Sequence, residues 1–366
     1  MTRISRFCKQ QAVLLIAALA AAVSMLFVPL SGRYLDYIDF HSLSLLFCLM
    51  AVVAGFQDCG VLDALVRRLL SAGTSLRLLS LLLVLFSFFL SMLVTNDVAL
   101  LTLVPLTILL LGRVTAPNIL VRVLVLQTLA ANLGSMATPI GNPQNLFLYQ
   151  FFSMTPRQFF AAVLPYTLLC GGALAAASLW VPQHVLSIRF QEQAFSPDWK
   201  RVAPLTFLFL LSLLTVLGLA DWRLTLGVVL AWLLLFARPL LKRVDYSLLL
   251  TFVFFFIFSG NMKHIPAVHK LFTSMMAENA LLTSALVSQV ISNVPAAVLL
   301  SGFTQDARGL LLGVNIGGLG TPIASLASVI TLRLYLKTEG AKPGRYLLEF
   351  SAWNFAGLVL LLLLAH

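Results

Sequence analysis

Two segments of the chain repeat a pattern of polar and helix-breaking residues inside apolar surroundings. The first reads NLGSMATPI (132–140) and the second NIGGLGTPI (315–323), with Asn, Gly, Thr, Pro and Ile at identical spacing. Glycine and proline interrupt a helix, which frees carbonyl groups to coordinate cations and leaves half-helix N-termini that face anions. Asparagine and threonine side chains add oxygens and hydrogen-bond donors. These residue types therefore predict a site that binds small ions.

A shorter polar motif precedes each repeated segment. TND (95–97) and SNV (292–294) each interrupt an apolar run. Asp97 has no acidic counterpart, because Val294 occupies the equivalent position. A carboxylate inside a membrane protein is expected to be protonated, to be paired or to bind a cation. We therefore expect Asp97 to be a coupling site for a proton or cation. The alternative is that it caps the following helix, over 98–111.

The composition is that of a polytopic α-helical membrane protein. Of the 366 residues, 60% are hydrophobic and 10% are charged, whereas soluble domains carry about 25% charged residues. The runs 11–30 and 346–365 are each long enough to cross a bilayer. The basic residues are scattered in short loops, which argues against nucleic acid as a partner. The four cysteines have no metal-binding spacing and are expected to pack in the interior; they are Cys8, Cys48, Cys59 and Cys170.

The distribution of lysine and arginine predicts the orientation in the membrane. When the N-terminus is placed in the cytoplasm, 18 of the 24 basic residues fall in cytoplasmic loops. This bias follows the positive-inside rule. We therefore expect a multi-pass protein of the bacterial inner membrane, with a cytoplasmic N-terminus, an external C-terminus and the lipid bilayer around it.

The repeated motifs divide the chain into two halves of opposite orientation. The arms of segment 78–112, about 15 residues each, reach about 23 Å, which is short of a hydrocarbon core of about 30 Å. A re-entrant hairpin is favoured over two full spans, and 280–305 repeats the pattern from the opposite side. The predicted fold is all-α, with two inverted repeats that each contain a re-entrant hairpin and a discontinuous helix. The predicted parts are an N-terminal helix and loop (1–42), a first repeat (43–156), linking helices with a cytoplasmic loop (157–245), a second repeat (246–336) and a C-terminal helix (337–366).

Hairpin tips with [ST]-N, each followed by an unwound N-x-G-x-x-x-T-P helix, resemble the ion transporter superfamily. This group includes divalent anion/sodium symporters, citrate-metal symporters, arsenite-efflux permeases and NhaD-type sodium/proton antiporters. The resemblance covers about 43–152 and 246–336. It implies a scaffold and a mobile transport part, commonly in a homodimer. It also implies an elevator-like movement and Na⁺ or H⁺ as the coupling ion, with no other cofactor.

The resemblance also assigns roles to the residues of the motifs. The cation-binding candidates are Thr95, Asn96, Asp97, Asn132, Gly134, Ser292, Asn293, Asn315 and Gly317, with Asn96 and Asn293 as the candidate Na⁺ ligands. The substrate-binding candidates are Asn96, Asp97, Thr138, Pro139, Asn142, Asn293, Thr321 and Pro322.

The branch within the superfamily stays open. The dicarboxylate symporters favour Ser-Asn-Thr at both tips, whereas this chain has Thr-Asn-Asp and Ser-Asn-Val, and TPIGNPQN (138–145) resembles a signature of the arsenite and NhaD branch. The function predicted first is secondary active transport of a small anion, either an inorganic oxyanion or a carboxylate. The alternatives are an NhaD-type cation/proton antiporter and an ion channel. We do not expect an enzyme, since the acidic residues and histidines do not cluster.

Overall fold

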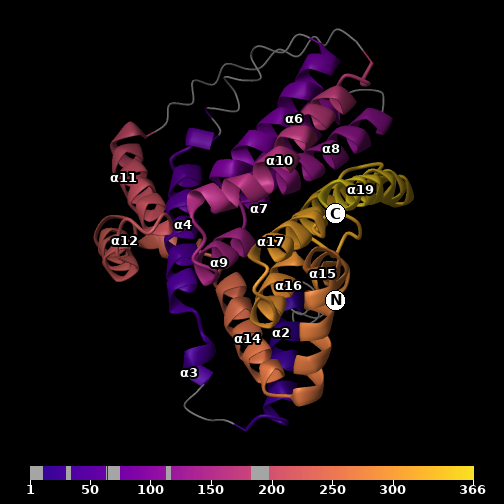
Figure 1. Cartoon of the computed structure of the whole chain (residues 1–366). Helices are drawn as coiled ribbons and strands as arrows, with labels where there is room; N and C mark the ends of the chain where they lie inside the picture. The colour runs from indigo at the N-terminus through magenta and orange to yellow at the C-terminus, as the bar shows by residue number, and fades with distance from the viewer. Residues whose placement is uncertain (1–10, 30–33, 63, 65–74, 113–116, 183–197) are drawn as a thin grey trace, which may run out of the picture.

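The computed structural model describes residues 11–29, 34–62, 64, 75–112, 117–182 and 198–366 (Figure 1). The regular structure within these ranges is helical, as predicted for the fold class. Cys8, the basic residues before residue 11 and most of the predicted cytoplasmic loop lie outside the described residues.

Seven helices in the described part of the chain are long and apolar enough to cross a membrane. They are α4 (Phe40–Asp58), α6 (Leu76–Leu93), α8 (Pro117–Ser135), α10 (Pro156–Ser178), α11 (Trp199–Val216), α14 (Tyr246–Lys263) and α19 (Pro343–Ala365). The other helices are α2 (Ala12–Met25), α3 (Tyr34–Tyr37), α7 (Asn96–Leu111), α9 (Pro143–Phe151), α12 (Trp222–Phe236), α13 (Arg238–Leu241), α15 (Pro266–Ile291), α16 (Asn293–Leu300), α17 (Ala307–Ile316) and α18 (Leu326–Tyr335).

The helix lengths correct one sequence argument. α6 has 18 residues and spans about 27 Å, so the first arm of the predicted hairpin 78–112 is not too short to cross a membrane. The second predicted hairpin does consist of short arms. α15 is interrupted at Asn279 (φ −158°, ψ 96°), and α16 has 8 residues. The re-entrant course of both hairpins remains a prediction.

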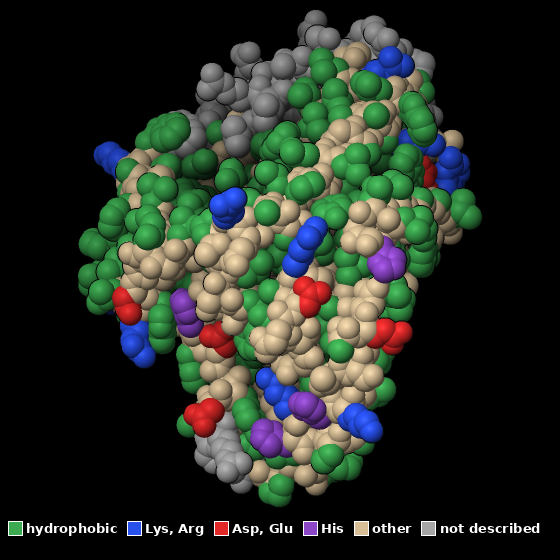
Figure 2. Space-filling view, in the orientation of Figure 1, with side chains coloured by type: hydrophobic (Ala, Val, Ile, Leu, Met, Phe, Trp, Pro, Cys, Tyr) green, Lys and Arg blue, Asp and Glu red, His purple; other side chains and the backbone are tan. Residues whose placement is uncertain are grey.

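The surface is apolar and the interior contains polar groups, as expected of a protein that faces lipid. Leu224, Val290 and Leu363 are each more than 70% exposed. In Figure 2, hydrophobic side chains extend over the visible face, and charged side chains are few and scattered among them. Buried polar residues include Asn132, Asn145 and Gln127.

Two hydrophobic clusters hold the helices together. The larger one includes α6, α7 and α8, which lie together with α10. The smaller one joins α4 to α11 and α12, which lie at one side of the molecule in Figure 1. Cys48 and Cys59 are buried in this smaller cluster, and Cys170 is buried in the larger one. These three thiols are free and pack in the interior, as predicted.

Aspartate residues cap the N-termini of several helices. Asp39, Asp245 and Asp306 each accept a hydrogen bond from a backbone N–H in the first turn of the helix that follows, at 2.9–3.0 Å. Asp221 does the same at the start of α12. Such caps satisfy N–H groups that have no partner inside the helix. Several of the few acidic residues of this chain therefore have a structural role, which sets Asp97 apart.

Candidate functional site

Two interrupted helices lie at the centre of the site. α8 ends at Ser135 and α9 begins at Pro143, so residues 136–142 form a first break. α17 ends at Ile316 and α18 begins at Leu326, so residues 317–325 form a second break. The first tip (95–97) follows α6 and includes the first two residues of α7, and the second tip (292–294) follows α15 and includes the first two residues of α16.

Each tip docks on the break of its own half through the same backbone hydrogen bond. The N–H of Asn96 donates to the carbonyl of Gly141 at 3.2 Å, and the N–H of Asn293 donates to the carbonyl of Ala324 at 2.9 Å. Gly141 and Ala324 both follow the sequence Thr-Pro-Ile. The repeated motifs therefore correspond to a repeated local structure.

The threonines of the two breaks make a second repeated contact. Thr138 donates its hydroxyl hydrogen to the carbonyl of Met92 at 2.6 Å, and Thr321 donates to the carbonyl of Gln289 at 3.2 Å. Met92 and Gln289 each lie four residues before the tip asparagine. Both hydroxyl hydrogens are therefore used to hold the breaks against the tips, and only the lone pairs of these oxygens remain for a ligand.

Asn132 connects the first tip to the second break. Its Oδ1 accepts hydrogen bonds from Asn96 Nδ2 at 3.0 Å and from Ser325 Oγ at 3.1 Å. Its Nδ2 lies 3.4 Å from Ser328 Oγ, to which it donates. All four residues are buried. Asn132 therefore bridges the two halves of the chain, in addition to any role as a ligand.

Asn315 makes the reciprocal connection to the first half. Its Oδ1 accepts from Asn142 Nδ2 at 3.0 Å, and its Nδ2 donates to Asn145 Oδ1 at 2.6 Å and to the carbonyl of Leu311 at 2.8 Å. When the two motifs are superimposed in sequence, Asn142 and Asn145 correspond to the two serines that contact Asn132. The asparagine at the end of each interrupted helix is thus held by residues of the other half.

The second tip has an unusual backbone conformation. Ser292 has φ 74° and ψ 157°, whereas the equivalent Thr95 has φ −62°. Positive φ in a residue other than glycine is strained by about 1–3 kcal/mol. The Ser292 hydroxyl donates to the carbonyl of Ala324 at 3.2 Å, and its N–H donates to the carbonyl of Ser288 at 3.0 Å. These contacts hold the strained tip against the second break.

Asp97 is not the cap of α7. The residue that precedes this helix is Thr95, whose side chain makes no capping hydrogen bond. The Oδ1 atom of Asp97 is enclosed, and no hydrogen-bond partner for it occurs among the described residues. The alternative in which Asp97 only caps its helix is therefore wrong. An enclosed carboxylate oxygen without a donor is the feature expected of a group that holds a proton or a cation.

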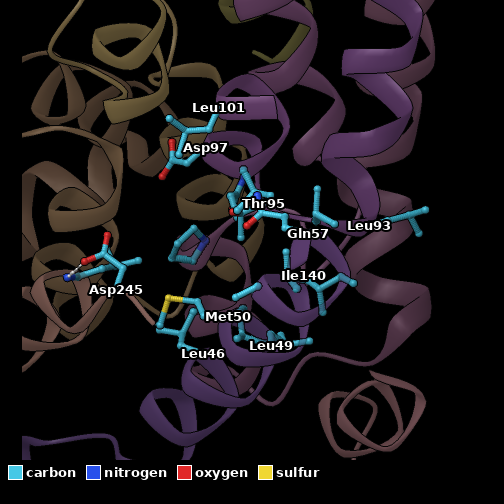
Figure 3. Close-up of a pocket in the computed structure, with 18 of the residues that line it drawn as sticks. Leu46, Leu49, Met50, Gln57, Leu93, Thr95, Asp97, Leu101, Ile140 and Asp245 are labelled. Carbon is cyan, nitrogen blue, oxygen red and sulfur yellow. Dashed lines mark hydrogen bonds between the residues drawn. The ribbon is translucent and has the colours of Figure 1, made fainter. Parts of the chain in front are cut away.

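Asp97 lines a cavity of about 290 Å³ (Figure 3). The cavity lies between α4, the start of α7, the start of α9 and the start of α14. Its polar lining residues are Gln57, Thr95, Asp97, Asn142, Arg243 and Asp245, and its apolar walls include Leu46, Leu49, Met50 and Ile140. Arg243 forms an ion pair with Asp58 at 2.7 Å. Among the described residues, no ion pair involves Asp97 or Asp245.

The cavity contains only some of the predicted ligands. Thr95, Asp97 and Asn142 line it. Asn96, Asn132 and Asn315 lie in the hydrogen-bond network between the halves, whereas the Oδ1 of Asn293 accepts from the N–H of the neighbouring Val294. Pro139 is buried and Pro322 is partly buried. Gly134 and Gly317 lie where a Cβ atom would meet the neighbouring helices α6 and α15.

A second cavity, of about 250 Å³, lies at the other ends of α9 and α14. Its lining residues are Asp36, Tyr37, Asp39, Phe147, Phe151, Phe256, Ser259, Gly260, Lys263, Val298 and Ser301. Lys263 Nζ lies 5.9 Å from the centroid of the Phe151 ring. Part of the Asp39 carboxylate is used locally, because it accepts hydrogen bonds from the backbone and the hydroxyl of Ser42.

Gln289 was missed by the sequence analysis. Its Nε2 donates to the carbonyls of Gly317 and Leu319 at 2.7 and 2.9 Å, and its Oε1 accepts from the N–H of Thr321 at 2.9 Å. One side chain therefore replaces three helical backbone partners at the second break. The available signal was a glutamine in an apolar run, one helical turn before the tip. Asp245 was also missed, since a helix-capping aspartate at a span end gives no signal of a cavity.

Comparison with known proteins places the chain in a family. A model of the citrate transporter family matches residues 7–316. The chain belongs to the citrate transporter family. This membership confirms the superfamily resemblance of the tips and breaks, and it identifies a membrane transporter of the citrate transporter type.

Curated relatives agree with this assignment. An uncharacterized transporter of Methanocaldococcus jannaschii is 34% identical over 317 residues, which cover 85% of each chain. The inner membrane protein YbiR of Escherichia coli is 33% identical over 315 residues, covering 84% of this chain and 83% of the relative. A 46 kDa membrane protein of Mycobacterium leprae is 26% identical over 373 residues, covering 87% and 82%.

The reciprocal asparagine network predicts a measurable loss of stability in Asn315→Leu. The substitution leaves Asn145 Oδ1 without its partner, and it removes one of the two acceptors of Asn142 Nδ2, which still donates to Ser135 Oγ at 3.2 Å. We expect the free energy of unfolding to fall by about 1–3 kcal/mol for each unsatisfied group. Thermal melting of the purified protein measures the change, with Asn118→Ala, at an exposed position in α8, as the control. Equal melting temperatures for both variants would show that the network does not hold the halves together.

Proposed function

We propose that this member of the citrate transporter family is a secondary active transporter that moves a small anion by elevator-type alternating access, coupled to Na⁺ or H⁺. The anion is an inorganic oxyanion or a carboxylate. The observation that carries the proposal is the reciprocal network in which Asn132 and Asn315 each bind residues of the other half. Two interrupted helices that meet in this way are typical of transporters built from inverted repeats.

The surroundings of the first cavity support an anionic substrate. α7, α9 and α14 all begin at this cavity, so the positive ends of three helix dipoles face it. A helix N-terminus favours negative charge, and its first N–H groups can donate to an anion. The carboxylates of Asp97 and Asp245 in the same cavity repel an anion unless a cation accompanies it. This arrangement supports coupled entry of an anion and a positive charge.

The second candidate function is NhaD-type cation/proton antiport. The enclosed, unpaired Oδ1 of Asp97 favours it, because one carboxylate that binds either a cation or a proton is sufficient for exchange. Antiport needs no anion in the cavity, so the two functions differ in what must be present for cation flux.

Flux into proteoliposomes tests the proposal. We expect saturable uptake of at least one of citrate, succinate, phosphate, sulfate or arsenite, driven by an inward Na⁺ or H⁺ gradient. The control liposomes contain no protein. Cation/proton exchange without any anion would favour antiport, and a rapid current that does not saturate would favour a channel.

A further inference from the structure

α9 and α14 run from the first cavity to the second. Leu146 and Leu248, near the starts of these helices, line the first cavity. Phe151 and Lys263, at their ends, line the second. The two helices therefore have the same direction along one path, with a cavity at each end.

Three phenylalanines of α9 and α14 pack together just after the residues that line the first cavity, because Phe147 follows Leu146 and both Phe252 and Phe256 follow Leu248. The ring centroids of Phe147 and Phe256 are 5.4 Å apart, those of Phe147 and Phe252 are 6.4 Å apart, and those of Phe252 and Phe256 are 5.9 Å apart. The side chains are 1%, 0% and 5% exposed for Phe147, Phe252 and Phe256. Phe147 and Phe256 also line the second cavity. We call these three residues the aromatic seal.

We propose that the second cavity is the opposite mouth of the transport route, and that the aromatic seal is the barrier between the two mouths. The inference rests on the proposed function in one respect, since it assumes that a small ion passes along α9 and α14. An apolar constriction excludes ions because neither water nor polar side chains replace their hydration shell inside it. The seal therefore keeps the two sides separate while one cavity is open.

The second mouth contains a cationic group suited to a small anion. Lys263 forms no ion pair among the described residues, and its ammonium lies near the face of Phe151. Ser259 and Ser301 also line this cavity, but their hydroxyl hydrogens are donated to the carbonyls of Leu299 and Val298, which leaves Lys263 as the group that favours an anion. Asp36 also lines this cavity, so the mouth carries both signs of charge. A cation and an anion can therefore both be received there.

Sided labelling tests whether the cavities are opposite mouths. In a variant without its four cysteines, Gln57→Cys places a thiol in the first cavity and Asp36→Cys places one in the second. We expect a membrane-impermeant maleimide to label the two thiols from opposite faces of a proteoliposome. Labelling of both thiols from the same face would overturn the proposal.

A leak assay tests the seal itself. We expect Phe147→Ala to raise the passive leak of H⁺ or Na⁺, without substrate, by about tenfold, because removal of the ring lowers the barrier by about 1.4 kcal/mol. Phe147→Leu retains an apolar side chain and keeps the fold testable if the alanine variant unfolds; its expected leak is smaller but above that of the wild type. Phe89→Ala, on the exposed face of α6, is the control.

The outcomes separate this inference from the proposed function. If folded Phe147 variants show the same passive leak of H⁺ or Na⁺ as the wild type, the aromatic seal is not the barrier. This conclusion holds whether or not the wild type transports an anion. Opposite labelling and a leak in Phe147→Ala support the route even if gradient-driven anion uptake fails, in which case only the proposed function is wrong.

Discussion

Gly134→Ala should abolish transport, whereas Gly172→Ala should leave it unchanged. Gly134 lies in α8 where that helix touches α6. A Cβ atom there would overlap the carbonyl oxygen of Phe88 and would lie 2.7 Å from Ser91 Oγ. Because the carbonyl oxygen of Phe88 belongs to the backbone and cannot rotate away as a side chain can, α8 or α6 must move. Gly172 has no heavy atom within 4 Å of an added Cβ and is therefore a matched control.

A shift of α8 or α6 should disturb the hydrogen-bond network between the two halves as well as lower the stability. Gly134 lies two residues after Asn132, whose contacts to Asn96 and Ser325 connect the halves. Overpacking of this kind typically costs about 1–3 kcal/mol. We expect a lower melting temperature and no uptake for Gly134→Ala, and the same for Gly317→Ala, where the Cβ would lie 2.8 Å from Ala285 Cα. Gly134→Ala protein with normal uptake and melting would refute this account of the helix contact.

Asp97→Asn should separate substrate movement from the ion gradient. Asp97 lines a cavity, and its enclosed Oδ1 has no donor among the described residues, so the carboxylate is expected to hold a proton or to bind a cation. Asparagine has a similar shape but carries no charge that a cation can neutralise. We expect downhill flux to persist while accumulation against a concentration gradient falls at least about tenfold, a loss of about 1.4 kcal/mol of coupling free energy.

Uptake with and without an imposed Na⁺ or H⁺ gradient measures this loss. Glu278→Gln, which removes an exposed carboxylate of α15 that lines neither cavity, is the control for a general change in surface charge. Because the substitution removes an unpaired enclosed charge, we expect the melting temperature of Asp97→Asn to be equal to or higher than that of the wild type. Full dependence on the gradient in Asp97→Asn would show that this carboxylate is not the coupling site.

The repeated motifs predicted where the two tips and the two breaks lie, and the structure shows which of their residues meet. Asn96 and Asn293 dock on the residues that follow Thr-Pro-Ile, because the same motif makes the same backbone hydrogen bond twice. The all-helical fold followed from composition and from the length of the apolar runs. The residue type of Asp97 predicts a coupling role, since charge without a partner is expensive in an apolar environment, and that role stays a prediction.

The contacts between the halves could not be predicted from spacing. Asn142 and Asn315 are 173 residues apart, and their contact depends on how the halves pack. Gln289 satisfies backbone groups at the second break, but its type alone does not distinguish this from a lipid-facing or packing position. The first arm is longer than predicted, because α6 begins at Leu76, before the start of the predicted hairpin 78–112.

Counterflow tests the central claim, alternating access of one site, most directly. Proteoliposomes are preloaded with unlabelled substrate and diluted into labelled substrate, without any ion gradient. We predict that labelled substrate accumulates transiently above its external concentration. A site that carries an unlabelled molecule out returns with a labelled one, so labelled substrate enters in exchange for unlabelled substrate. Equilibration without such an overshoot, at the same rate with empty and preloaded vesicles, would contradict alternating access and indicate a channel.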